Sequence, residues 1–225
     1  VMVLLLNDFN TLYSLGQKYY NEKNYEKSSK YFKRLTILNP SLFEAHFYLS
    51  AIYELRGEFS NAITEFEVLC MLKPKDKQLK DFLLKLYFKN KSYRKAINLL
   101  RKLLSQYQHD IEYRVLLCEA LFFAKRYKYA EKLLYREYKK NPNSERIMFS
   151  LMLTLREKRK LKGARKICKK LVKEYPLNPV YHYFLGTIYE DMKNYKRMKQ
   201  EINSAYSILK IDVKLQNTFN IFNFY

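Results

Sequence analysis

The chain has 225 residues, of which 48% are hydrophobic and 16% aromatic, and it carries a formal net charge of +21. This apolar content excludes a disordered chain, and no stretch approaches the ~20 consecutive apolar residues of a membrane-spanning helix. The charge is uneven, because residues up to Asp76 hold nine basic and nine acidic side chains, and the whole positive excess follows.

The cysteines and the first residues bear on the cellular compartment of the protein. Cys70, Cys118 and Cys168 have no metal-ligand spacing, and we expect small buried thiols in a reducing environment. The apolar residues 1–6 have neither a basic leader nor a small-residue cleavage site. We therefore expect a cytoplasmic protein, and a periplasmic or secreted one only if a leader has been removed.

A fixed period of 34 residues organises the chain. It separates, singly or doubled, the prolines Pro40, Pro74, Pro142 and Pro176, and it separates the alanines Ala62, Ala96, Ala130 and Ala164. Such a period is typical of stacked helical hairpins, which bury their apolar faces only against their neighbours. We predict one domain of six helix pairs, with units at residues 9–42, 43–76, 77–110, 111–144, 145–178 and 179–212.

The first unit shows how each pair is built. Leu12, Gly16 and Tyr19 recur at helical spacing on a first helix, and residues 21–24 form a turn whose Asn24 caps the second helix. Tyr25 and Phe32 lie on that second helix, which ends before Pro40 because a residue preceding proline avoids the α conformation.

Later helix starts carry their own signals. Ser41 and Glu44 have the spacing of a capping box ahead of the second unit. Asp76 and Asp110 occupy the equivalent cap positions before the third and fourth units. Asn178 precedes Pro179, which favours a helix start there in the sixth unit.

The last residues predict a terminal helix. Leu215, Phe219 and Phe222 recur at helical spacing, so residues 213–225 are expected to cap the sixth unit. A frayed tail and the start of further repeats are the alternatives.

This pattern resembles the tetratricopeptide repeat (TPR) family over residues 9–212. Gln108 in place of the exit proline, Glu137 in place of a small residue and Leu161 in place of an aromatic depart from the family pattern. The resemblance implies an all-α, right-handed superhelix whose concave wall is built from first helices. It also implies that close helix approach at Gly16 and Gly186 depends on their small size.

The family's inner-wall positions give a candidate groove. Aromatic residues are frequent there, and aromatic surface often marks binding sites. We therefore expect a protein or peptide partner, although the rings could instead pack against neighbouring helices. No three consecutive units carry the family's carboxylate clamp for chaperone tails. The candidate residues are Tyr13, Gln17, Tyr20, Phe47, Glu54, Asp81, Lys85, Phe88, Glu119, Phe122, Phe123, Phe149 and Arg156.

A second candidate surface is basic. The run from Arg156 to Lys160 is followed by a positive face on one helix, and further lysines lie in unit four. A solvated face, an acidic protein and nucleic acid are the three interpretations, and the last is disfavoured because aromatic residues are absent from this helix face. The face comprises Lys162, Arg165, Lys166, Lys169, Lys170 and Lys173.

The sequence lacks the patterns of an active site. His46 and His182 occupy equivalent positions four units apart, His109 lies in a linker, and four glycines form no phosphate-binding loop. We predict no catalytic residue, metal or cofactor. The expected function is a non-catalytic interaction scaffold, with electrostatic binding or a docking arm of a larger enzyme or assembly as alternatives. No pattern predicts the oligomeric state.

Overall fold

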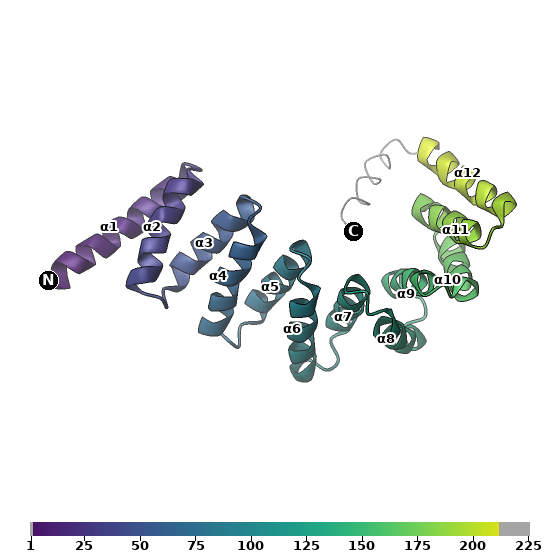
Figure 1. Cartoon of the computed structure of the whole chain (residues 1–225), viewed down its shortest axis with the longest axis horizontal. Coiled ribbons are helices and arrows are strands. Elements are labelled where there is room, and N and C mark those ends of the chain that lie inside the picture. The colour runs from purple at the N-terminus through teal and green to yellow at the C-terminus, as the bar shows by residue number, and fades with distance from the viewer. Residues whose placement is uncertain (1, 212–225) are drawn as a thin grey trace. The chain divides into compact units, whose positions relative to one another are not determined.

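The computed structural model describes residues 2–211, and the side chains of residues 8–210. Within these residues the chain is helical between short turns and contains no strand (Figure 1). The expected helix at 213–225 lies outside the described residues. The helices are α1 (Met2–Asn21), α2 (Tyr25–Leu38), α3 (Phe43–Leu55), α4 (Phe59–Leu72), α5 (Lys77–Lys89), α6 (Tyr93–Gln106), α7 (Ile111–Phe123), α8 (Tyr127–Lys140), α9 (Glu145–Glu157), α10 (Leu161–Glu174), α11 (Pro179–Asp191) and α12 (Tyr195–Ile211).

The helix starts keep the period of the sequence. The second helices begin at Tyr25, Phe59, Tyr93, Tyr127, Leu161 and Tyr195, a constant interval of 34 residues. The first helices from α3 onward begin at the same interval, from Phe43 to Pro179. Only α1 is longer than expected, since it begins at Met2 rather than near residue 9. The predicted all-α repeat fold is therefore confirmed.

The alanine series lies in the core. Ala62, Ala96, Ala130 and Ala164 are all fully buried on second helices, as close helix packing requires. A Cβ added at Gly16 would lie 3.0 Å from the Phe32 ring, and one at Gly186 would lie 2.9 Å from Ile202 Cδ1. The expected close approach is therefore confirmed, and it joins each glycine to a side chain of the paired helix.

Every turn between paired helices uses one left-handed residue. The positive-φ positions are Lys23, Gly57, Lys91, Lys125, Arg159 and Lys193, again at intervals of 34 residues. In each turn the next amide donates to the carbonyl five residues earlier, as from Asn24 to Tyr19 at 2.8 Å. This is the Schellman arrangement, which satisfies the carbonyls at a helix end. Five of the six positions carry a basic residue where glycine is the favoured choice.

Most of the predicted caps are confirmed. The side chains of Asn24, Asp76, Asp110 and Asn178 each accept a backbone N–H at the start of the following helix. The capping box at Ser41 is wrong, because α3 begins at Phe43 after Leu42, one residue later than that box requires. The Ser41 amide instead donates to Asn39 Oδ1 at 3.1 Å, within the turn that follows α2.

The chain divides into two compact units, Val1–Leu99 and Leu100–Tyr225, and the division falls inside α6. In unit 1, α1 packs on α2 and α3 on α4, while α2 contacts α3 and α4 contacts α5. In unit 2 the pairs are α7 with α8, α9 with α10 and α11 with α12. No helix in the described part of the chain combines the length and apolarity needed to cross a membrane.

Candidate functional site

An aromatic pocket of about 520 Å³ lies between α1 and α3 of unit 1. This volume falls in the range of about 300–1,000 Å³ typical of ligand pockets. Five rings line it together with two charged side chains. The lining residues are Tyr13, Tyr20, Phe43, Glu44, Phe47, Tyr48 and Lys73. We call this set the aromatic pocket.

One buried ring and its half-buried neighbours form the base of the aromatic pocket. Phe32 of α2 is fully buried and stacks on Tyr48, with ring centroids 4.5 Å apart and planes 5° apart. Tyr20 meets the Tyr48 ring edge-on at 5.1 Å. Gln17 Nε2 donates to Tyr48 Oη at 3.0 Å and to Tyr13 Oη at 3.3 Å. These contacts hold the rings in one arrangement.

The rim of the aromatic pocket is open and charged. Phe47 is 48% exposed, although phenylalanine is usually buried. Its ring stacks on that of Phe43, with centroids 6.4 Å apart. Lys73, the residue that follows α4, places its ammonium 4.0 Å from the Phe43 ring centroid. Neither Lys73 nor Glu44 forms an ion pair within the described residues. The rim therefore offers an exposed ring beside one charge of each sign.

The phenols of Tyr13 and Tyr20 in the aromatic pocket stay neutral at physiological pH. Burial raises the pKa of Tyr13, and Tyr48 and Glu44 add to that rise. Burial likewise raises the pKa of Tyr20, with smaller contributions from Tyr25 and Tyr48. The pocket wall is therefore apolar ring surface with hydroxyl groups that hydrogen-bond at its edge.

Four predicted groove residues thus meet at one place: Tyr13, Gln17, Tyr20 and Phe47. The other candidates in unit 1 lie elsewhere on its helices. Glu54 pairs with Lys89 at 2.5 Å, and Phe88 meets Tyr93 edge-on at 6.0 Å. Lys85 lies over the Phe82 ring, and Asp81 on α5 is half-buried.

The candidates in unit 2 are engaged with their neighbours. Both carboxylate oxygens of Glu119 accept from Arg146, at 2.7 and 2.9 Å, and Arg156 pairs with Asp191 at 2.7 Å. The three phenylalanines are half-buried in ring clusters. Phe122 contacts Phe123 and Tyr127, and Phe149 contacts Tyr181 and Phe184.

Sequence reasoning missed Phe43, Tyr48 and Lys73. The family's inner-wall positions include neither the first residue of a unit nor the sixth, where Phe43 and Tyr48 lie. Lys73 comes from the end of α4, outside any first helix. The available signal was the adjacent pair of rings Phe47 and Tyr48, of which Phe47 lies one period after Tyr13 of α1.

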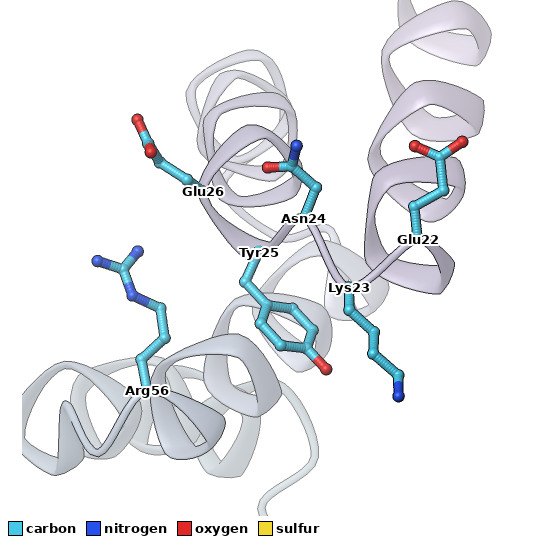
Figure 2. Close-up of a pocket in the computed structure, with 6 residues that line it drawn as sticks. All are labelled: Glu22, Lys23, Asn24, Tyr25, Glu26 and Arg56. Atoms are coloured by element: carbon cyan, nitrogen blue, oxygen red, sulfur yellow. The ribbon is translucent and has the colours of Figure 1, made fainter.

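A second depression of about 590 Å³ lies where the first two repeats meet, lined by Glu22, Lys23, Asn24, Tyr25, Glu26 and Arg56. Figure 2 shows Glu22 and Glu26 on opposite sides of the turn and Arg56 rising toward Glu26. Glu22, just after α1, already pairs with Lys18, and Glu26 pairs with Lys30 of its own helix. Because the charged groups do not converge, this depression has no arrangement suited to a ligand.

Much of the predicted basic surface is neutralised internally. Lys158 and Lys160 both pair with Glu131 of α8, and Arg159 joins Arg156 on Asp191. The run from Arg156 to Lys160 therefore ties the turn after α9 to neighbouring helices. The α10 face is different. Among the described residues no ion pair involves its exposed Lys162, Lys166, Lys169 and Lys173, or the half-buried Arg165.

The histidines have structural contacts. His46 Nδ1 lies 2.6 Å from Glu65 Oε2, and its Nε2 lies 2.9 Å from the Pro40 carbonyl. His182 repeats this bridge with Glu201 and Pro176. Each histidine thus ties a first helix to the preceding loop and to its own second helix. In the part of the chain that the structure describes, no three His, Cys, Asp or Glu side chains could hold a metal ion.

Three family models described as tetratricopeptide repeat match the chain, over residues 13–77, 87–147 and 180–208. Together these matches cover more than half of the chain. Among curated proteins, no sequence matches this chain significantly.

Solved structures show the same fold. A tetratricopeptide repeat protein from Parabacteroides merdae is 15% identical with a TM-score of 0.66, and the match covers 89% of this chain and 80% of that one. MamA from Desulfovibrio magneticus is 16% identical with a TM-score of 0.64, covering 76% and 96%. YrrB, a TPR protein described as having an unusual peptide-binding site, is 15% identical with a TM-score of 0.56, covering 84% and 97%.

Proposed function

Because this chain belongs to the tetratricopeptide repeat family, we propose that it is a non-catalytic interaction scaffold that binds a peptide or partner segment in the aromatic pocket of unit 1. Its family and its fold support a role in protein interaction. The observation that carries the specific proposal is the set of five rings around about 520 Å³, with Phe47 half-exposed at the rim.

The mechanism is preorganisation. Phe32 and Gln17 already fix the rings at the base, so binding costs little side-chain ordering. An aromatic or aliphatic side chain of the partner enters the aromatic pocket and displaces water from ring surface. Lys73 and Glu44 at the rim then contact the polar backbone and flanking charges of the bound segment.

The test is selection of binding peptides from a random library on the purified chain, followed by affinity measurement on variants. Phe47→Ala should weaken the selected peptides by about tenfold, because aromatic anchors at interfaces contribute on the order of 1–2 kcal/mol or more. Since Phe47 is already 48% exposed, its removal should leave the fold intact.

Phe82→Ala is the matched control. Phe82 is a first-helix phenylalanine that is 51% exposed and does not line the aromatic pocket. Its replacement should leave the affinity unchanged. If Phe82→Ala weakens binding as much as Phe47→Ala, the assignment to this pocket is wrong.

A further inference from the structure

We propose that the outer face of α8 and α10 in unit 2 binds single-stranded nucleic acid. The surface consists of lysines and exposed tyrosines on two neighbouring second helices, and it is independent of the aromatic pocket in unit 1. We call it the basic-aromatic face, and it comprises Lys128, Tyr129, Lys132, Tyr135, Lys139, Lys162, Lys166, Lys169 and Lys173.

The two helices present matching rows of charge. Lys128, Lys132 and Lys139 of α8 recur one period later as Lys162, Lys166 and Lys173 of α10. All six side chains are exposed, and no ion pair within the described residues involves them. At about 1.5 Å rise per residue, each row spans about 16 Å, which is long enough to follow several phosphates of one strand.

Contacts between the helices place these rows side by side. Lys170 of α10 donates to the Pro142 carbonyl at 2.7 Å, just after α8, and its ammonium lies 5.6 Å from the Tyr138 ring centroid of α8. Near the start of α10, a Cβ at Gly163 would lie 3.9 Å from Tyr135 Oη. The two rows therefore belong to one continuous surface.

The acidic residues of these helices do not offset this charge. Glu131 and Glu137 of α8 are buried, and each lies within 4 Å of two basic side chains. Glu174, the last residue of α10, pairs with Lys170 at 3.6 Å. Two of these three carboxylates are therefore buried and the third is ion-paired within α10, whereas the lysines of both rows are exposed.

The exposed tyrosines favour single-stranded nucleic acid over other negatively charged partners. Tyr129 is 64% exposed and Tyr135 is 38% exposed, and they are the exposed large apolar side chains of α8 and α10 among the described residues. Lys128, Lys132, Tyr135 and Lys139 lie at i, i+4, i+7 and i+11, so the Tyr135 ring and the three lysines share one helix face, and Tyr129 lies beside that face, one residue after Lys128. This interleaving, absent from α10 alone, suits phosphates on lysines and unpaired bases stacked on rings. Unpaired bases offer flat π surfaces for these rings on the same strand that carries the phosphates.

The test is fluorescence anisotropy with an oligouridylate of about twenty nucleotides, at about 50 mM and about 200 mM salt. We expect binding that weakens with salt. Lys132→Glu with Lys166→Glu should weaken it at least about tenfold and flatten its salt dependence. Lys30→Glu with Arg34→Glu, the same charge change on α2 of unit 1, should change it less than about twofold.

The tyrosines provide the decisive comparison. Tyr129→Ala with Tyr135→Ala should weaken oligouridylate binding at least about fivefold, whereas the corresponding Tyr→Phe pair should retain it. Silent tyrosine variants, equal affinity for a duplex of the same length, or no binding would overturn the proposal. Equal competition by polyglutamate or by phosphatidylserine vesicles would overturn it in favour of an acidic protein or a membrane surface.

Discussion

At the scale of single residues, the two buried carboxylates of the described residues, Glu131 and Glu137, each lie beside basic side chains. Glu131 lies on α8 with only 10% of its side chain exposed, and it accepts hydrogen bonds from Lys158 and Lys160. Burial alone would raise the pKa of this carboxyl group. The hydrogen bonds and the positive charges of the two lysines together outweigh burial, and the pKa is lowered.

The loss of folding stability caused by Glu131→Gln should therefore depend on pH. Because the folded pKa of Glu131 is depressed, its stabilisation is present above the unfolded value of about 4.3 and is lost as the pH falls through the folded pKa. We expect Glu131→Gln to lower the free energy of unfolding by about 1–3 kcal/mol at pH 7, and urea unfolding followed by circular dichroism should show the difference shrinking below about pH 4. A difference that stays the same across this pH range would contradict the assignment.

The thiols give a second prediction at this scale. Cys118 and Cys168 are fully buried, and burial raises the pKa of both, that of Cys168 to about 12. Burial also raises the pKa of the half-buried Cys70, to about 11. Because the thiolate is the reactive form, we expect none of the three to react quickly with a thiol reagent at pH 8 until the chain unfolds. Rapid labelling of Cys118 in the native protein would show that its burial is incorrect.

At the scale of the helix pair, the left-handed turn residue is a repeated source of strain. A Cβ at Gly57, with φ of +72°, would meet nothing within 4 Å, so any cost of Gly57→Ala comes from the backbone. We expect a loss of about 1 kcal/mol. Lys91→Gly, at the equivalent position with φ of 55°, should instead gain up to about 1 kcal/mol.

The control for this pair is Lys80→Gly, which lies in the regular helical backbone of α5 and should lose about 1 kcal/mol. Thermal or urea unfolding of the three variants measures all the effects. If Lys91→Gly and Lys80→Gly destabilise equally, the turn does not require the left-handed conformation.

Local features of each pair were predictable from the sequence. Helix starts, four side-chain caps and the buried alanines follow from residue type and spacing within a few positions. The turn at residues 21–24 was predicted, but its left-handed residue Lys23 was not, because a lysine in the left-handed conformation has no sequence signature. The capping box at Ser41 failed because two overlapping cap patterns competed, and Asn39 took the Ser41 amide.

Features that join distant residues were less predictable. The aromatic pocket combines Tyr13, Phe43 and Lys73 from three helices or their ends, and spacing alone does not place Lys73 over a ring. In the same way, the sequence alone indicates a free basic patch from Arg156 to Lys160. The structure shows that Glu131 and Asp191 form ion pairs with residues of this run. Long-range pairing of side chains decides which charges remain available.

At the scale of the whole molecule, the two proposed surfaces lie in units of different charge. Unit 2 holds 27 basic and 12 acidic residues and so carries +15 of the net +21. The aromatic pocket lies in unit 1, where ring surface rather than charge dominates. Binding to the pocket should therefore be only weakly salt-dependent, whereas binding to the basic-aromatic face should fall steeply with salt.

The measurement that tests the scaffold proposal most directly is an amide chemical-shift titration of the labelled full chain with a library-selected peptide. We predict that the largest shifts fall on Tyr13, Tyr20, Phe43, Phe47 and Tyr48, and that Phe47→Ala removes them while Phe82→Ala does not. Saturable shifts centred on another surface, unchanged by Phe47→Ala, would contradict the account.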